Sequence, residues 1–403
     1  MSAFFHQKMK ITHIFKILFS LMFSVSLYAQ DGIMNQGEMV SKKVYHEIPF
    51  FNTKDEIVQF VTLKGKSFKF IFDTGAPLAI SNELQNSHQY PILHLVPLKD
   101  AHNNSDTIKI VLIDTIQIGN IVFKDIPAVV IDFKNSPIGC QNIDGIIGSN
   151  IARFLLVQFD LSQNKIIFTD QHDKIIFAKE KLPIILDNQS NAFFKVNFND
   201  TIIDSLHFDS GMGKLYDMNI STAKKLIVTF KDEKNNFYKG YGISGQGILG
   251  NAQEEETYLI NTKFKLGNHI IENAQIGTTP TVSRIGRELL NHGILTIDYI
   301  RKQYSFEKYP HRLNHPKPNF GFEIITEENK VIVGVVWENT KAQKAGLVSG
   351  TEIKEINGIA FNSKSSCEIE KILEIEFSKK KLRITYLKSG IEKTRVFGLI
   401  KNK

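Results

Sequence analysis

The stretch "SFKFIFDTGAPLAIS", residues 67–81, places a carboxylate at the end of an apolar strand. Phe68, Phe70 and Phe72 alternate along the run, which stops at Asp73. This alternation is typical of a strand with one buried face. An ionised carboxylate in an apolar setting is costly unless another group compensates it. The stretch therefore predicts a buried strand that ends in a carboxylate, with a second group nearby that compensates the cost of burying it.

The same arrangement occurs again at residues 206–213, "LHFDSGMG", where Asp209 ends an apolar strand. Each aspartate is preceded by a strand, a short polar turn and a second strand. Two later landmarks also recur in the same order. They are residues 113–120 against 260–268, and residues 145–168 against 283–306.

The spacing of these landmarks is nearly constant, since the aspartates are 209 − 73 = 136 positions apart and Gly148 and Gly286 are 138 apart. A repeat of this kind predicts two copies of one structural unit. We therefore expect two homologous β-rich lobes, at residues 30–170 and 171–309.

A pseudo-twofold relation between such lobes would bring Asp73 and Asp209 together at the axis. Two carboxylates that share a site cannot both ionise cheaply, so the pair keeps one proton over a range of acidic pH. The ionised member can take a proton from a water, while the protonated member donates to an amide carbonyl oxygen. The pattern thus indicates general acid–base hydrolysis without a covalent intermediate.

Four neighbouring residues are expected to support the pair. Thr74 and Ser210 supply hydroxyls of matching type, which can hydrogen-bond across the axis and hold the loops rigid. Gly75 and Gly211 let the backbone come close to the carboxylates.

The segments "DTGA" at 73–76 and "DGIIG" at 144–148 resemble the aspartic peptidases of the pepsin and retropepsin type, and the second set, "DSG" and "RIG", is similar. The resemblance covers roughly residues 45–308. It implies a mainly β fold with two homologous β-barrel lobes in tandem, and Asp73 and Asp209 as the catalytic pair. It also implies polypeptide substrates and no cofactor.

Three residues depart from the family pattern. Pro77 and Met212 stand where other residue types are usual, and Arg284 stands where the second support segment should be apolar. We expect the local backbone to turn Arg284 away from the dyad.

Family members also close a hairpin flap over the substrate. The better candidate is "GYGISGQGILG" at 240–250, because its glycines allow a mobile tip. The equivalent in the first lobe is residues 100–107, and a plain surface loop remains the alternative for both. The flap candidates are Tyr241, Gly242, Ser244 and Gly245.

The proline-containing residues 310–317 read as a linker, and the pattern changes after them. Residues 319–324, "NFGFEI", and 344–358, "KAGLVSGTEIKEING", resemble a PDZ domain, so residues 318–403 are expected to form a PDZ-like α+β domain. The resemblance implies that a peptide C-terminus binds there while the peptide adds a strand to the sheet. The implied binding residues are Phe320, Gly321 and Phe322, with backbone N–H groups of the last two as donors. A domain that only packs against the lobes is the alternative.

The N-terminus carries basic residues and then the apolar run "ILFSLMFSVSLYA", residues 17–29. Thirteen residues suit the core of a signal peptide and are short for a membrane span. We therefore predict a signal peptide at 1–29 and export to the periplasm or the extracellular space, with no integral membrane segment after its removal. An uncleaved anchor is the alternative.

The composition, 42% hydrophobic and 23% charged over 403 residues, is that of a globular protein. The net charge of +7 comes from scattered lysines and arginines, which argues against a nucleic-acid partner. The two cysteines, Cys140 and Cys367, fall in different predicted domains, so no disulfide framework is expected. No zinc-type spacing of His and Cys occurs, and no metal is predicted.

The sequence thus favours an exported aspartic endopeptidase with a PDZ-like domain. The rival hypothesis is a catalytically inactive peptide-binding protein of the same fold.

Overall fold

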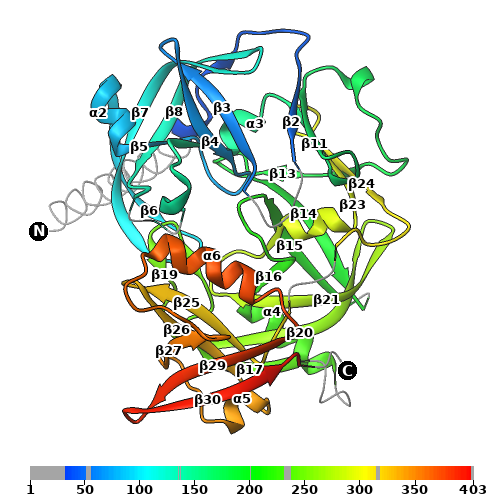
Figure 1. Cartoon of the computed structure of the whole chain (residues 1–403). Coiled ribbons are helices and arrows are strands. Elements are labelled where there is room, and N and C mark those ends of the chain that lie inside the picture. The colour runs from blue at the N-terminus through cyan, green and yellow to red at the C-terminus, as the bar shows by residue number, and fades with distance from the viewer. Residues whose placement is uncertain are drawn as a thin grey trace, which may run out of the picture.

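The computed structural model describes residues 32–50, 56–134, 136, 138–199, 201–230, 237–314 and 318–400. The predicted signal peptide lies outside these residues. The described strands form sheets of eight, six and fourteen strands and one small ribbon (Figure 1). The prediction of a mainly β fold is confirmed. Among the helices of the described part of the chain, none has the length and apolar character needed to span a membrane.

The eight-stranded sheet is built from the first third of the chain, in the order β1-β8-β5-β9-β4-β3-β7-β6. Its hairpin β3–β4 turns at Lys64 and Gly65, both with positive φ (45° and 77°), as a tight hairpin turn that matches the strand twist requires. The strands are β1 (Glu38–Met39), β3 (Val58–Leu63), β4 (Lys66–Phe72), β5 (Ala79–Ser81), β6 (Ile92–Lys99), β7 (Ser105–Ile118), β8 (Ile121–Ile131) and β9 (Gly145–Ile147).

The fourteen-stranded sheet repeats the same pairing pattern later in the chain. β4 pairs in parallel with β9, and β15 pairs in parallel with β22. β5 and β16 likewise pair in parallel with β8 and β21, and antiparallel with β9 and β22. The strands concerned are β14 (Ala192–Phe198), β15 (Ile202–Asp209), β16 (Tyr216–Asn219), β20 (Glu255–Leu266), β21 (His269–Thr279) and β22 (Arg284–Gly286). The boundaries predicted at residues 170 and 309 stay predictions.

The six-stranded sheet combines strands from both repeats, because β10 pairs with β23 at its centre. Phe159 on β10 packs between Phe72 and Phe208, with ring centroids 6.0 and 5.0 Å away. The residues that precede the two aspartates therefore rest on one buried side chain. The strands are β2 (Tyr45–Pro49), β10 (Leu156–Asp160), β11 (Lys165–Thr169), β12 (Leu182–Pro183), β23 (Gly293–Asp298) and β24 (Gln303–Lys308).

Residues 318–400 build a separate core around Phe322, Val333 and Leu382, covered by helix α6. A capping box, in which Ser365 and Glu368 bond reciprocally, fixes the start of this helix. The helices and strands are β25 (Phe322–Glu327), β26 (Lys330–Trp337), α5 (Lys341–Lys344), β27 (Glu352–Ile356), β28 (Ile359–Ala360), α6 (Ser366–Glu376), β29 (Lys381–Lys388) and β30 (Ile391–Gly398).

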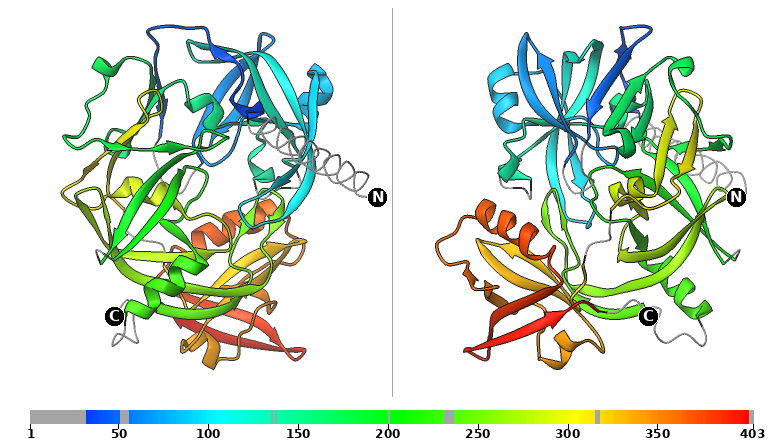
Figure 2. Two further views of the ribbon diagram at one scale, coloured as in Figure 1. Left: turned by 180° about the vertical axis from the view of Figure 1, so that it is seen from behind. Right: turned by 45° about the vertical axis from the view of Figure 1, so that its right-hand side comes forward.

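This C-terminal unit is joined to the preceding strands by backbone pairing. β17 (Phe237–Gly242) pairs with β20 on one side and with β26 on the other, so one sheet runs through both units (Figure 2). Trp337 and Val335 pack with Leu259 in a small core at this junction. The C-terminal unit is therefore attached as a continuation of the sheet.

A disulfide between Cys140 and Cys367 contradicts the expectation from the sequence, since their Cα atoms lie 5.2 Å apart. Cys140 lies in a short 3-10 segment (Gly139–Gln141), and Cys367 lies in the first turn of α6. The prediction was wrong because the cysteines are 227 positions apart, and only the packing of the C-terminal unit brings α6 to this loop.

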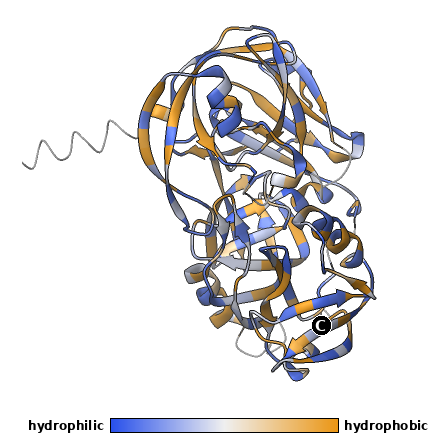
Figure 3. Ribbon diagram, turned by 60° about the vertical axis from the view of Figure 1, so that its left-hand side comes forward, coloured by the Kyte–Doolittle hydropathy of each residue, from blue (hydrophilic) through white to orange (hydrophobic). Residues whose placement is uncertain are grey.

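Short elements complete the described chain. Hydrophobic and hydrophilic residues alternate along many strands (Figure 3), as half-buried strands require. The remaining helices and strands are α2 (Asn82–His88), α3 (Ser149–Ala152), α4 (Ile220–Thr229), β13 (Ile185–Leu186), β18 (Gln246–Gly247) and β19 (Gly250–Asn251), and the 3-10 segments are Ile33–Asn35, Leu161–Gln163, His172–Lys174 and Arg287–Asn291.

Candidate active site

Asp73 and Asp209 occupy equivalent positions at the ends of β4 and β15. Asp73 directly follows β4, and its N–H donates to the carbonyl of Ile147 on β9 (3.0 Å). Asp209 is the last residue of β15 and lies opposite Gly286 on β22. Each aspartate therefore sits where two parallel neighbouring strands fix the backbone.

Thr74 and Ser210 form a reciprocal lock between the two loops. The N–H of Thr74 donates to Ser210 Oγ (2.9 Å), and the N–H of Ser210 donates to Thr74 Oγ1 (3.0 Å). Each hydroxyl then donates to a strand carbonyl, Thr74 to Phe208 (2.6 Å) and Ser210 to Phe72 (3.1 Å). Both side chains are fully buried, so the four bonds hold the loops in one relative position.

The glycines after these residues allow the carboxylates to approach the opposite loop. A β-carbon on Gly75 would lie 2.6 Å from Asp209 Cγ, and one on Gly211 would lie 2.4 Å from Asp73 Oδ2. Any side chain at either position would collide with a carboxylate.

The surroundings of Asp73 favour its protonated form. Burial raises the pKa of Asp73 well above its usual range, and the charge of Asp209, which is within hydrogen-bonding reach, raises it further. The N–H groups of Gly75 (2.8 Å) and Gly211 (3.1 Å) donate to Asp73 Oδ1 and oppose this shift only in part. The pair thus retains a proton beyond acidic pH.

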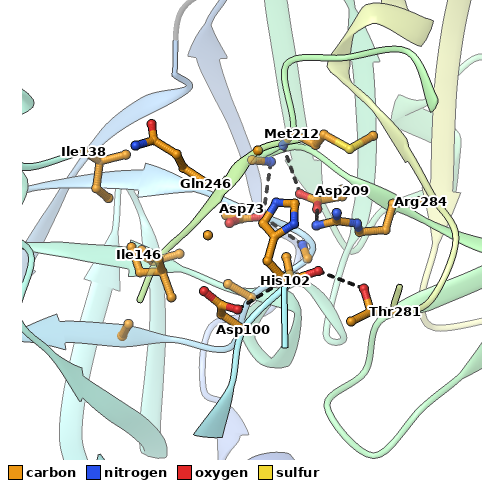
Figure 4. A pocket seen from close by; sticks show the side chains of 18 of the residues that line it. Asp73, Asp100, His102, Ile138, Ile146, Asp209, Met212, Gln246, Thr281 and Arg284 are labelled. Carbon is orange, nitrogen blue, oxygen red and sulfur yellow. Dashed lines mark hydrogen bonds and ion pairs between the residues drawn. The ribbon is translucent and has the colours of Figure 1, made fainter. Parts of the chain in front are cut away.

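Arg284 does not turn away from the pair, contrary to the expectation from the sequence. Its side chain is buried, with Nη1 3.5 Å from Asp209 Oδ2 and Nη2 3.6 Å from Asp217 Oδ2. Figure 4 shows the guanidinium extending toward Asp209. The strand register explains the difference, because Arg284 on β22 lies opposite His207 on β15 and Asp217 on β16. The carboxylates on these strands compensate its buried charge.

Arg287 and Glu56 form a second buried ion pair behind the dyad, which the sequence reasoning missed. Arg287 Nη1 lies 2.8 Å from Glu56 Oε2 and donates to the carbonyl of Ser210 (2.5 Å). Arg287 therefore braces the loop that carries Asp209. Its place directly after "RIG" is the only signal in the sequence, and nothing local marks Glu56.

The dyad opens into a cavity of about 610 Å³ (Figure 4). One wall is aliphatic and comes from the eight-stranded sheet and from the loop between its strands β8 and β9. It includes Ile71, Val129, Ile131, Ile138 and Ile146. The opposite wall is polar and includes His207, Lys214, Asp217, Ser244 and Arg284.

Two hairpin tips meet above the dyad: the tip between β6 and β7, and the tip between β18 and β19, which carries Leu249. The β6–β7 tip contributes Asp100 and His102 to the cavity. Asp100 Oδ2 accepts the N–H of Leu249 from the other tip (3.2 Å). A β-carbon on Gly245 would lie 2.8 Å from His102 Nε2, and one on Gly247 would lie 2.1 Å from Asp100 Oδ2. The sequence reasoning did not single out His102.

The four flap candidates differ in their positions. Ser244 and Gly245 line the cavity, whereas Tyr241 is 60% exposed. Tyr241 and Gly242 belong to β17 and pair with Val336 and Val335 of β26. The glycines here serve close packing, since a β-carbon on Gly242 would lie 2.0 Å from the carbonyl oxygen of Gly334.

The three residues predicted to bind a peptide C-terminus lie at the start of β25, away from the dyad along the chain. Phe320 and Phe322 are buried in the C-terminal core. The N–H of Gly321 already donates to Asn319 Oδ1 (2.8 Å). Trp337 N–H donates to Gly321 O, so in the antiparallel register the N–H of Phe322 points away from β26.

Several polar atoms around the cavity are buried without a hydrogen-bond partner. They are His102 Nδ1, His207 Nδ1, Asp217 Oδ1, Ser244 Oγ and Arg284 Nε. Such atoms are costly to leave unpaired, so this wall suits a hydrogen-bonding ligand. Among the described residues, no group of three or more His, Cys, Asp or Glu side chains is placed to hold a metal ion.

One segment of this chain is similar to a known protein family. Residues 60–151 match the family model for aspartyl proteases, a segment that contains Asp73 and not Asp209. None of the curated proteins matches the chain significantly. The family match supports an aspartic peptidase.

Matches among solved structures include three proteins. Edgp is 12% identical over 67% of this chain and 96% of its own, with a TM-score of 0.39. A retropepsin-like aspartic protease from Rickettsia conorii is 19% identical over 33% and 93%, with a TM-score of 0.24. Basic 7S globulin from soybean is 13% identical over 67% and 98%, with a TM-score of 0.39.

Proposed function

We propose that this chain is an exported aspartic endopeptidase that hydrolyses peptide bonds with a water held between Asp73 and Asp209. The ionised carboxylate takes a proton from the water as its oxygen attacks the amide carbon. The protonated carboxyl gives its proton to the carbonyl oxygen. The tetrahedral diol then collapses, and the C–N bond breaks as the nitrogen is protonated.

The observation that carries this proposal is the pair of carboxylates that two hydrogen-bonded loops hold within hydrogen-bonding reach of each other. Thr74 and Ser210 hold the loops by four hydrogen bonds, and burial with the Asp209 charge raises the pKa of Asp73. Both aspartates line the cavity. A general acid and a general base within one cavity are what amide hydrolysis needs.

Polypeptides are the proposed substrates. The cavity is large enough for side chains on both sides of a scissile bond, and its two walls differ in polarity. The hairpin tips that meet above the dyad must separate for an extended chain to enter, as a lid does.

We also propose that residues 318–403 act as a PDZ-like domain for peptide C-termini, with Phe322 N–H as the main donor. The pairing of β25, which among the described strands is with β26 alone, supports this. Residues 1–29 are proposed to direct the chain out of the cytoplasm, to the periplasm or the extracellular space.

A catalytically inactive peptide-binding protein is the second candidate. The ion pair between Arg284 and Asp209 favours it, because an arginine that held Asp209 permanently ionised would weaken its action as a base.

The deciding experiment is hydrolysis of a mixed peptide library from pH ~3 to ~8, a range that spans free carboxylates and the raised Asp73, with Asp73→Asn and Asp209→Asn in parallel. Cleavage by the wild type that both substitutions abolish supports the endopeptidase. Peptide binding without cleavage, retained in both variants, supports the binding protein instead.

A further inference from the structure

We infer that Arg284 decides which member of the dyad carries the shared proton, so that Asp209 is the base and Asp73 is the acid. This inference rests on the proposed function and assigns a positioning residue to it. Arg284, one of the three residues that depart from the family pattern, thereby acquires a role in the mechanism.

Arg284 places a positive charge directly beside Asp209, whereas the second buried arginine, Arg287, is paired with Glu56. Arg284 is 7% exposed and contacts Asp209 and Asp217, at 3.5 and 3.6 Å. A guanidinium stays charged at any ordinary pH, and a buried charge of this kind needs carboxylates beside it. Asp209 therefore stabilises Arg284 best when it is ionised.

The other basic groups around Arg284 do not supply a comparable positive charge to Asp209. Lys214 is engaged by Glu323 of β25 (3.6 Å) and by the carbonyl of Ser244. Burial lowers the pKa of His102 and of His207, and the charge of Arg284 lowers both further. Both imidazoles are therefore neutral near pH 7.

Asp73 has the opposite surroundings. Its Oδ1 accepts the N–H groups of Gly75 and Gly211, which leaves Oδ2 to carry the proton. The charges of Asp209 and Glu56 add to burial in favouring the neutral carboxyl. Only one proton is available to the pair, and it therefore resides on Asp73.

The reaction follows with both protons accounted for. The water oxygen bonds to the amide carbon as its proton passes to Asp209, and the proton of Asp73 passes to the carbonyl oxygen. In the second step Asp209 gives its proton to the amide nitrogen and Asp73 recovers one from the diol as the C–N bond breaks. Arg284 favours the second transfer, because the charge that returns to Asp209 restores the ion pair.

The first test is the pH dependence of kcat/KM for Arg284→Met, Arg284→Lys and Asp217→Asn, with the exposed Arg301→Met as a matched control. The acid limb reports protonation of Asp209. Loss of the positive charge in Arg284→Met should move this limb toward neutral pH. Arg284→Lys should stay near the wild type, and Asp217→Asn should move the limb to lower pH.

The two variants are expected to shift the acid limb in opposite directions. Asp217→Asn can therefore still decide the question if Arg284→Met fails to fold. An acid limb that stays unchanged in Asp217→Asn, or moves the same way in both charge-removing variants, overturns the inference. Such a result leaves the proposed function intact as long as the wild type cleaves peptides.

The second test does not require peptidase activity. An aliphatic epoxide is opened by an ionised carboxylate, which bonds to carbon while a neighbouring carboxyl protonates the epoxide oxygen. In the wild type at pH ~5 the ester should map to Asp209 by mass spectrometry, and in Arg284→Met it should spread to Asp73. An ester on Asp73 in the wild type overturns the inference, whether or not the protein proves to be a peptidase.

Discussion

Thr74 and Ser210 exchange backbone and hydroxyl hydrogen bonds across the centre of the molecule, at 2.9 and 3.0 Å. The two residues are 136 positions apart, yet each completes the hydrogen bonding of the other. This relationship joins the two repeats directly behind the carboxylates.

Removing one hydroxyl of this lock should destabilise the whole fold. Thr74→Val keeps the shape of the side chain and leaves buried partners of Thr74 Oγ1, the N–H of Ser210 and the carbonyl of Phe208, unpaired. We expect a loss of at least about 2 kcal/mol in the free energy of unfolding, measured by urea denaturation. The exposed Thr107→Val is the control, and an equal effect of both substitutions would contradict a special role for the lock.

The raised pKa of Asp73 makes stability depend on pH with a definite sign. A folded pKa above the unfolded value means that the neutral carboxyl is favoured by folding, so its contribution is complete at low pH and is lost as pH rises through the folded pKa. Asp73→Asn mimics the neutral form and should raise Tm at pH ~8 by roughly 2 °C or more relative to the wild type. At pH ~4 the two proteins should unfold at closely similar temperatures. A larger gain at pH ~4 than at pH ~8 would show that the sign is wrong.

The disulfide between Cys140 and Cys367 should contribute strongly to stability. It closes a loop of 227 residues, and cross-links of this kind stabilise by about 2–5 kcal/mol. Cys140→Ser, Cys367→Ser and the double variant should lose a similar amount in thermal unfolding, because each removes the same bond. Reduction of the wild type is the matched control. A double variant as stable as the oxidised wild type would argue against the link.

The contact between the hairpin tips should depend on the lack of a side chain at Gly247. A β-carbon there would lie 2.1 Å from Asp100 Oδ2, so Gly247→Ala must displace the Asp100 carboxylate that Leu249 N–H and His102 N–H donate to. Backbone hydrogen exchange of residues 248–251 should rise several-fold. Gly398→Ala, where a β-carbon meets nothing within 4 Å, should leave this exchange unchanged. Unchanged protection in Gly247→Ala would mean that the tips meet in some other way.

The strands and the lock were accessible from the sequence because each depends on local pattern and on the repeat. The alternation of Phe68, Phe70 and Phe72 identified β4, and the recurrence of its Asp-containing turn identified the pair. Arg284 was read wrongly because sequence gives a residue type and not the strand register that turns it toward Asp217 and Asp209.

By itself, the sequence determined the mainly β fold and the residues that end the two aspartate-bearing strands. Short-range alternation and turn chemistry set these features, so they can be read from neighbouring residues. The tertiary structure alone decided the side of the dyad that carries Arg284, the disulfide to α6 and the meeting of His102 with Gly245. Each of these depends on how segments far apart in the chain pack. The free energy of burying a charge or of forming such a contact is set by that packing and not by the neighbouring residues in the sequence.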